Sequence, residues 1–254
     1  MRKSLIAGVA VAALAMSVAA SPAFAATAIT GAGSSFANNL MQYTAAKYPS
    51  DDGVTYGSIG SGNGRKNFVN SITNFAVTDT AFGSSDTKPT AGTYTFTPLA
   101  GAPVAFVYNQ TKHFKGTDKK QHVMPANLKI SAAVVSGILR GEITKWNDTA
   151  IQSINKGKVL PTAKIRVYYR TAGSGTNTNV TNYLSQVVGT SKWVAGGKND
   201  LSTAAVSATI SGTAKANSTL LSSAVQNDVF GFGYFDLSDA VSAKVNKFAL
   251  KNAA

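Results

Sequence analysis

The chain contains no cysteine, and only two histidines, among its 254 residues. Without thiolates it needs no disulfides, has no lipidation site behind a leader peptide, and offers few ligands for zinc or a transition metal. His113 and His122 both lie in a lysine-rich stretch, where solvent exposure is a simpler interpretation than catalysis. The sequence therefore predicts no metal, no cofactor and no acylated N-terminus.

Recognisable catalytic patterns are also missing. The sequence has no Gly-x-Ser-x-Gly turn. Ser85-Asp86-Thr87-Lys88 has the Ser-x-x-Lys spacing, but neither Ser-Asp-Asn nor Lys-Thr-Gly accompanies it. An enzyme would need a nucleophile beside a base, paired carboxylates or a metal. We therefore predict that the chain is not an enzyme.

Acidic residues are scarce: 11 Asp and Glu stand against 24 Lys and Arg, which gives a formal net charge of +13. Nucleic-acid-binding proteins usually gather their cations on one face or one helix. The densest group here runs from Lys112 to Lys120, in a polar stretch that is typical of a solvated loop. The charge therefore favours attraction to small anions or an anionic cell wall, and no nucleic acid is expected.

The longest apolar run is confined to the beginning of the chain. Two cations precede the stretch Leu5–Ala20, and Ala23-Phe24-Ala25 supplies the small-x-small pattern that signal peptidase cleaves. A membrane anchor fits less well, because the run is short and ends just before the cleavage pattern. We expect residues 1–25 to be a signal peptide, the mature chain to begin at Ala26, and the protein to be secreted, periplasmic or cell-wall associated.

The rest of the chain alternates β-rich runs with amphipathic helical stretches, which indicates an α/β fold. Strands are predicted at 26–30, 54–59, 75–77, 103–108, 164–169 and 229–237, and helices at 36–48, around 68–72, after Ser131 as far as Gly141, and around 180–188. Residues 202–223 are rich in Ala, Ser and Thr and have no clear pattern. A Gly/Thr/Pro-rich passage from Ser84 to Gly101 predicts a boundary between lobe I (26–101) and lobe II (102–254).

A strand, a Gly/Ser-rich turn and a helix follow one another three times, with turns at Thr30–Phe36, Gly60–Gly64 and Arg170–Thr176. A helix N-terminus presents free N–H groups and a partial positive charge, and glycine lets the backbone approach a ligand closely. The arginine adds a charged fork that can bond two oxygens of one phosphate-like group. One such turn alone is usually an ordinary helix cap, but three together favour a site for a tetrahedral oxyanion. Strict P-loop and dinucleotide motifs do not fit.

Several linked patterns extend these turns to a family resemblance. The patterns follow one another in the order Thr30–Phe36, Tyr56–Gly64, Gly141–Asp148 and Arg170–Thr176, and a weaker match is added by Gly231–Tyr234. Together they resemble the phosphate-binding component of high-affinity phosphate ABC transporters. The resemblance implies a type II periplasmic-binding-protein fold, in which two α/β lobes close on the ligand in the cleft between them.

The resemblance also implies which residues bind inorganic phosphate. The expected ligands are Ser35, Phe36 and Ser61 from the first lobe and Arg170, Ser174, Gly175 and Thr176 from the second. Asp79 falls where the family has an aspartate that accepts the proton of bound phosphate. Such a carboxylate would repel an oxyanion that has no proton, such as sulfate. Asp86 lies in a locally similar stretch, but its distance from Ser61 in the sequence favours Asp79.

The chain departs from the family in two places. Ala172 stands where the family usually has an aspartate that orients the arginine, so we expect a looser Arg170. The chain also ends at Ala254, whereas family members continue and return to complete the first lobe. That lobe is then expected to be thinner, covered by a partner, self-associated or rebuilt, for instance by a return of the extreme C-terminus.

Two functions are compatible with these residues. The first is an exported solute-binding protein that captures inorganic phosphate for import through an ABC permease. The second is a secreted cell-surface or interaction protein that keeps the phosphate-binding-protein fold without a transport role. A neighbouring permease gene would favour the first, and abundant surface assemblies the second.

Overall fold

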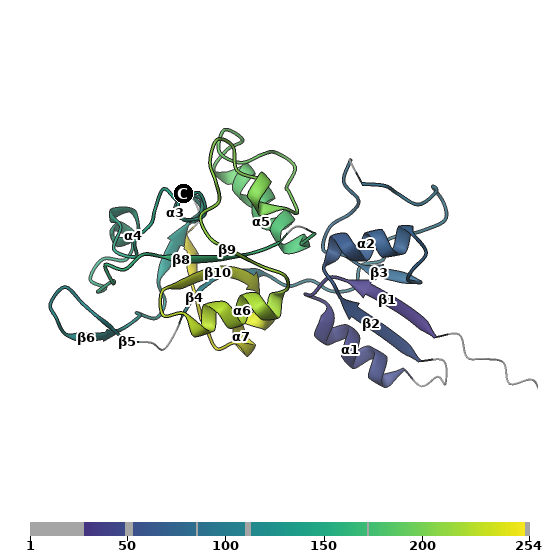
Figure 1. The fold of residues 1–254 in the computed structure, drawn as a ribbon, viewed down its shortest axis with the longest axis horizontal. Coiled ribbons are helices and arrows are strands. Elements are labelled where there is room, and N and C mark those ends of the chain that lie inside the picture. Colours follow the sequence, from purple (N-terminus) through teal and green to yellow (C-terminus); the bar gives the residue numbers. More distant parts are fainter. Residues whose placement is uncertain (1–27, 49–52, 85, 110–112, 172, 252–254) are drawn as a thin grey trace, which may run out of the picture.

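The structure is a computed structural model that describes residues 28–48, 53–84, 86–109, 113–171 and 173–251. These residues form two α/β lobes that lie side by side along the longest axis of the molecule (Figure 1). The expected signal peptide and Ala172 lie outside the described residues. Among the described helices, none has the length and apolarity needed to cross a bilayer.

The first lobe is a parallel sheet in the order β2-β1-β3, with one helix on each face (Figure 1). Its elements are β1 (Ile29–Gly33), α1 (Asn38–Lys47), β2 (Val54–Ser58), α2 (Ser61–Val69) and β3 (Phe75–Val77). Because all three strands are parallel, their carboxyl ends lie at one edge of the sheet, and this edge faces the second lobe.

The second lobe is built on a mixed sheet in the order β11-β4-β10-β8-β9. Its elements are β4 (Val104–Tyr108), β5 (His113–Lys115), β6 (Gln121–Val123), β7 (Lys129–Ser131), α3 (Ala132–Leu139), α4 (Thr149–Ile154), β8 (Arg166–Arg170), α5 (Gly175–Val187), a short 3-10 helix (Leu201–Thr203), β9 (Thr213–Lys215), α6 (Ser218–Asn227), β10 (Gly231–Asp236), α7 (Leu237–Ser242), β11 (Asn246–Lys247) and β12 (Ala249–Lys251). Strands β10, β8 and β9 run parallel, whereas β4 is antiparallel to β10.

Strand β10 is the centre of the second lobe, because all six of its residues are buried. Successive side chains of a strand point to opposite faces of the sheet. Phe232 and Tyr234 accordingly pack in the larger core with Trp146, while Phe235 packs on the opposite face with Leu221 of α6. The residues at the ends of β8 and β10 are therefore supported by a sheet whose central strand is packed on both faces.

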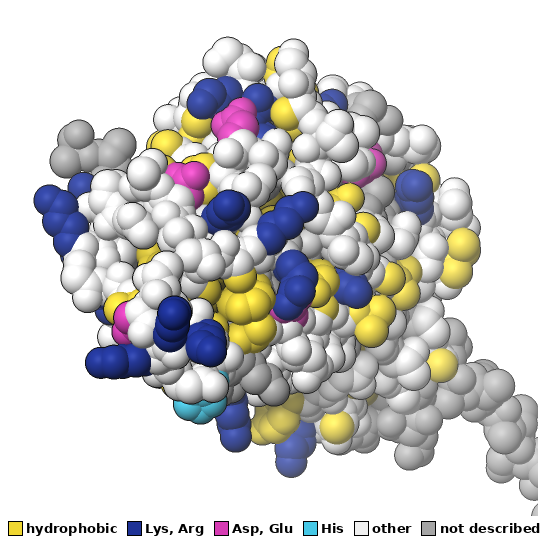
Figure 2. Space-filling view, turned by 60° about the vertical axis from the view of Figure 1, so that its left-hand side comes forward, with side chains coloured by type: hydrophobic (Ala, Val, Ile, Leu, Met, Phe, Trp, Pro, Cys, Tyr) yellow, Lys and Arg dark blue, Asp and Glu magenta, His cyan; other side chains and the backbone are white. Residues whose placement is uncertain are grey.

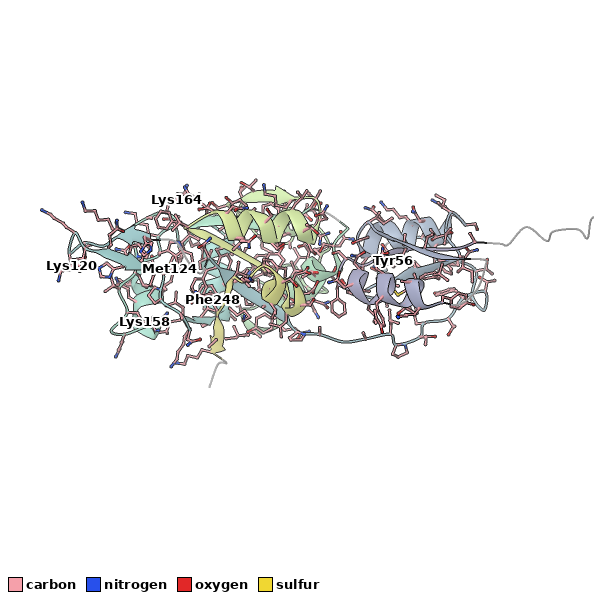
Figure 3. All side chains as sticks on the ribbon, turned by 90° about the horizontal axis from the view of Figure 1, so that it is seen from below. Tyr56, Lys120, Met124, Lys158, Lys164 and Phe248 are labelled. Carbon is pink, nitrogen blue, oxygen red and sulfur yellow. The ribbon has the colours of Figure 1, made fainter. Side chains whose placement is uncertain are left out.

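The core of the first lobe is smaller, consisting of Ala37, Met41 and Tyr56 with Phe75 and Val77 packed against it. Figure 3 shows Tyr56 within this lobe, far from the labelled side chains of the second lobe. Figure 2 shows lysines and arginines dispersed over the far end of the second lobe, with few acidic side chains among them. The cations on that face do not gather into a single stripe.

The predicted strands at 54–59, 75–77, 103–108 and 229–237 are confirmed, and Ser131 caps α3 by accepting a hydrogen bond from the Val134 N–H. The prediction of a second helix around residues 68–72 is wrong in its position. Helix α2 begins at Ser61, and Ile72 lies beyond its end with 63% of its surface exposed. The polar turn after β2 is itself the first turn of that helix, which the apolar pattern could not reveal.

The lysine-rich stretch was also wrongly predicted as a loop throughout. Residues 113–115 and 121–123 form a two-stranded hairpin, because Phe114 is buried and anchors it. His122 contacts the Asp118 carboxylate at 2.8 Å. At the other end of the chain, β11 and β12 pair with β4 and β7, so the described C-terminal residues lie in the second lobe and do not return to the first.

Candidate functional site

The turns that follow β1, β2 and β8 meet between the two lobes. The Gly62 N–H of α2 donates a hydrogen bond across the lobes to the Gly173 carbonyl, at 2.8 Å. A Cβ atom at Gly62 would lie only 2.8 Å from the Cα of Gly173, so glycine is required for this close backbone approach. The three Gly/Ser-rich turns of the sequence are thus one structural feature.

Arg170 is the centre of this feature. It is the last residue of β8, and its guanidinium crosses to the first lobe. Its Nη1 donates to the Ser35 hydroxyl at 3.0 Å and to the Ser218 hydroxyl at 2.8 Å, and those two hydroxyls are themselves 2.8 Å apart. Its Nη2 donates to the Ala216 carbonyl at 3.4 Å. In the part of the chain that the structure describes, the partners of the guanidinium are therefore hydroxyl and carbonyl oxygens rather than a carboxylate.

The burial of Arg170 makes this environment unusual. Only 3% of the residue is exposed, yet within the described part of the chain no carboxylate lies within 4.0 Å of it and its Nε has no hydrogen-bond partner. Burial lowers the pKa of the guanidinium, against the more distant charges of Asp236, Asp79 and Asp239. A buried cation without a close anion is costly, so this site favours an anionic ligand.

Asp79 lies on the opposite side of the same cluster. Its carboxylate accepts a hydrogen bond from the Ser34 hydroxyl, and its backbone N–H donates to the Ser61 hydroxyl at 3.2 Å. A Cβ at Gly175 would lie 2.5 Å from Asp79 Oδ2 and 2.6 Å from Ser61 Oγ, so these three residues are in contact. Burial raises the pKa of Asp79, although Ser34, Ser61 and the charge of Arg170 oppose the shift.

The remaining predicted residues have different local roles. Ser174 is buried and caps α5, where its hydroxyl accepts a hydrogen bond from the Asn177 N–H at 3.2 Å. The Phe36 N–H donates to Ser34 Oγ at 3.1 Å. Phe36 and Thr176 both line the adjoining cavity. The structure thus brings Ser35, Ser61, Asp79, Arg170 and Gly175 into one cluster, with Phe36, Ser174 and Thr176 at its border.

Asp86 has another partner. Its carboxylate lies 3.1 Å from Nη2 of Arg65 and accepts a hydrogen bond from the Gly83 N–H at 2.8 Å. Arg65 also donates to the Thr78 hydroxyl at 2.9 Å. Asp86 therefore stabilises the end of β3 and its following turn, whereas Asp79 is the acid that contacts the cluster.

Several contributors could not be identified from the sequence. Tyr234 donates a hydrogen bond to the Asn177 side chain at 2.5 Å and accepts one from the Arg170 N–H at 3.4 Å. Asn177 in turn donates to the Arg170 carbonyl at 2.9 Å. This network fixes the backbone from which the Arg170 side chain projects. Ser34 and Ser218 join the cluster through their hydroxyls; Ser34 lies in the Thr30–Phe36 turn but was not among the predicted ligands, and Ser218 belongs to no recognisable motif.

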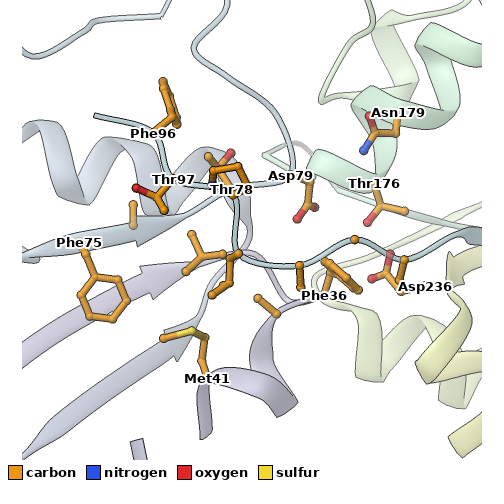
Figure 4. A pocket seen from close by; sticks show the side chains of 18 of the residues that line it. Phe36, Met41, Phe75, Thr78, Asp79, Phe96, Thr97, Thr176, Asn179 and Asp236 are labelled. Carbon is orange, nitrogen blue, oxygen red and sulfur yellow. The ribbon is translucent and has the colours of Figure 1, made fainter. Parts of the chain in front are cut away.

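A cavity of about 450 Å³ adjoins the cluster (Figure 4). Asp79, Thr176 and Asp236 lie on one side of it, whereas Met41, Phe75 and Phe96 lie on the other. Asp236 is the last residue of β10 and is 4% exposed. Burial, together with the charges of Asp79 and Asp239, raises its pKa to about 7.

A family model described as a PBP superfamily domain matches residues 18–253. The phosphate-binding protein PstS of Xylella fastidiosa is 32% identical over 229 residues, which are 89% of this chain and 58% of that protein. The phosphate-binding protein PstS of Haemophilus influenzae is 28% identical over 231 residues, which are 90% of this chain and 64% of that protein.

Among solved structures, the high-affinity periplasmic phosphate-binding protein PfluDING, bound with phosphate, aligns with a TM-score of 0.67 at 20% identity. The alignment covers 89% of this chain and 62% of that chain. This similarity confirms the predicted two-lobed α/β fold of the periplasmic-binding-protein type. The chain spans about three fifths of the length of these relatives. Each of them is named for binding and none for a reaction, in agreement with the prediction of a binding protein rather than an enzyme.

Proposed function

The chain belongs to the PBP superfamily, and from this premise we propose that it is an exported solute-binding protein that captures inorganic phosphate for an ABC importer. The observation that carries the proposal is Arg170, a buried cation that has no carboxylate within 4.0 Å among the described residues and contacts two hydroxyl groups and a carbonyl. A guanidinium can bond two oxygens of one phosphate group at once. The names of the relatives support the same ligand.

Phosphate would bind by replacing hydrogen bonds that the side chains of the cluster make with one another. Its oxygens would take the place that the Ser35 hydroxyl holds beside Nη1 of Arg170, and the freed hydroxyls would rotate to donate to the ligand. The first turns of α2 and α5 add backbone N–H groups and the positive ends of two helix dipoles. Because these groups come from both lobes, the ligand would hold the lobes together.

Asp79 would decide which oxyanion is accepted. Its carboxylate, when ionised, has acceptors only, so it can bind a ligand that still carries a proton. Hydrogen phosphate has such a proton, and sulfate at neutral pH does not. The burial of Asp79 strengthens the distinction, because an unpaired repulsion is costly where water is excluded.

The proposed location follows from the first 25 residues, which lie outside the described part of the chain. A cleaved leader would release the protein outside the cytoplasmic membrane, where a permease would be its partner. Mass spectrometry of the exported protein should then find an N-terminus at Ala26 without a lipid. An uncleaved or acylated N-terminus would contradict this location.

Calorimetric titration of the mature protein with phosphate tests the function. Arg170→Ala should weaken binding by about 2–5 kcal/mol, on the order of thirtyfold to a few thousandfold, as for a buried charged partner that is removed. Arg170→Lys should also weaken binding, because an ammonium group cannot reproduce the planar fork. Arg166→Ala is the matched control: Arg166 lies on the same strand, but its side chain is 54% exposed and pairs with Asp228.

The outcomes separate the two functions. Loss of affinity in both Arg170 variants and normal binding by Arg166→Ala would support phosphate capture at this site. Equal affinity in all variants would rule out the site. If the wild-type protein binds no phosphate at millimolar concentration, the transport role fails, and a surface protein that only keeps the fold becomes the better explanation.

A further inference from the structure

The cavity next to the proposed phosphate site is larger than inorganic phosphate requires. Its volume of about 450 Å³ falls within the range of about 300–1,000 Å³ that is typical of sites for small organic molecules. Phe36, Asp79 and Thr176 line it and are also among the predicted phosphate ligands, so the cavity and the anion site are adjacent. A ligand anchored at Arg170 could therefore extend into it.

The two sides of the cavity differ in chemistry. Met41, Phe75 and Leu99 supply an apolar wall, which suits a short hydrocarbon chain. On the opposite side, Thr176 and Asp236 supply a hydroxyl and a carboxylate (Figure 4). An organic ligand that fits both walls has an apolar middle and a polar end.

Asp236 specifies the charge of that polar end. It is 4% exposed, and its Oδ2 has no hydrogen-bond partner among the described residues. The charges of Asp79 and Asp239 raise its pKa further, whereas the charge of Arg170 and the backbone N–H of Asp236 itself lower it. A buried carboxylate oxygen without a donor is costly, and a cationic donor from a ligand would remove that cost. An ammonium group, with three donors and a positive charge, fits this position.

We propose that this cavity binds the organic part of a phosphonate or phosphate monoester that carries a primary ammonium group. The phosphoryl head would occupy the Arg170 site, the ammonium would donate to Asp236, and the methylene groups between them would face the apolar wall of Met41 and Phe75 across the cavity. The inference rests on the proposed function, because the head group uses the same anion site. Both charges of such a zwitterion would then face a residue of opposite charge.

Calorimetry with three probes tests this: inorganic phosphate, ethylphosphonate and 2-aminoethylphosphonate, at a pH of about 7.5. The two phosphonates share the phosphonate group and the chain and differ in the ammonium, so their affinity ratio, compared between the wild type and Asp236→Asn, measures the contact of the ammonium with Asp236. We expect 2-aminoethylphosphonate to bind about tenfold or more tightly than ethylphosphonate, in line with one hydrogen bond between charged groups. In Asp236→Asn the ratio should fall to about one, because the amide retains an acceptor but not the charge.

A second variant keeps the test decisive if Asp236→Asn does not fold. Ala100 lines the cavity and is exposed, so Ala100→Trp should fill the space and abolish binding of both phosphonates while inorganic phosphate still binds. Ala91→Trp, an exposed position of the same segment outside the cavity lining, is the matched control and should bind all three probes normally.

Each contrary result has a distinct meaning. If inorganic phosphate binds and 2-aminoethylphosphonate binds no better than ethylphosphonate, the inference is wrong and phosphate capture stands. If Ala100→Trp binds both phosphonates like the wild type, the cavity is not the site and the inference is wrong as well. If none of the three probes binds the wild-type protein, the proposed function and the inference fail together.

Discussion

Replacing Asp79 by asparagine should narrow the proposed preference of the protein for phosphate over sulfate. The Asp79 carboxylate is buried beside Ser61 and Gly175, accepts a hydrogen bond from the Ser34 hydroxyl, and lies in the same cluster as Arg170. Its remaining acceptor capacity is available for the proton of hydrogen phosphate. The asparagine has nearly the same shape, so the substitution changes charge and hydrogen bonding with little change in packing.

The magnitude follows from the hydrogen bond that is lost. A hydrogen bond to a charged group contributes about 1.5–3 kcal/mol, so phosphate affinity should fall on the order of tenfold to a hundredfold. Sulfate should change in the opposite direction, because the amide removes a negative charge and brings a donor to the same place. The ratio of phosphate to sulfate affinity is therefore the quantity that should change most.

Titration calorimetry with phosphate, arsenate and sulfate near neutral pH measures this ratio. The wild-type protein should bind phosphate and arsenate and nearly ignore sulfate. Asp86→Asn is the matched control, because Asp86 pairs with Arg65 at 3.1 Å, away from the cluster, and should leave the ratio intact. The reasoning is refuted if Asp79→Asn discriminates as strongly as the wild type, or if Asp86→Asn alone loses discrimination.

Two further predictions concern the residues around Arg170. Tyr234→Phe removes the hydroxyl that joins Asn177 to the Arg170 backbone. It should lower the free energy of unfolding by about 1–3 kcal/mol and weaken phosphate binding in calorimetry. Tyr169→Phe, on the neighbouring strand, is the control and should change both quantities little. The pKa of Asp236 is about 7 in the folded protein and about 4 in the unfolded chain, so the folded state holds the proton more strongly. The resulting contribution to the free energy of unfolding is fully present below about pH 4 and is lost as the pH rises to 7. The melting temperature of the ligand-free protein should therefore fall over this range, and a fall of the same size in Asp236→Asn would contradict the assignment.

The sequence predicted best those parts of the fold that local chemistry determines. Strand β10 is buried on both faces, and its apolar run has the composition that such a strand requires. Ser131 and Gly141 delimit α3 as a cap and a stop, and Gly141 has a φ of 73°, in the left-handed region that favours glycine. The turns at Gly60 and Arg170 could also be predicted from local chemistry, because each leads into a helix.

The contributors that escaped prediction are joined by contacts between distant parts of the chain. Ser218 meets Arg170 across 48 residues, from a segment of small polar residues with no periodic pattern. Asp236 lies on an apolar strand, where the sequence indicates only core positions, and the weak family match at Gly231–Tyr234 assigned no role to Tyr234. Ser34 adjoins a predicted ligand, yet only the bend after β1 determines that its side chain turns to Asp79. In each case the tertiary fold, and not local propensity, determines the role.

The charges around Arg170 connect the two ligand classes considered above. Asp236, Asp79 and Asp239 all act on this guanidinium, and burial raises the pKa of each of the three carboxyl groups. An oxyanion that brings only negative charge would add repulsion from these acids to the attraction of one cation. A ligand that carries a proton, or an ammonium group beside its phosphoryl group, meets the same acids with a donor. If both proposals hold, one physical effect, the local excess of carboxyl groups, would select against sulfate and in favour of protonated or zwitterionic phosphoryl compounds.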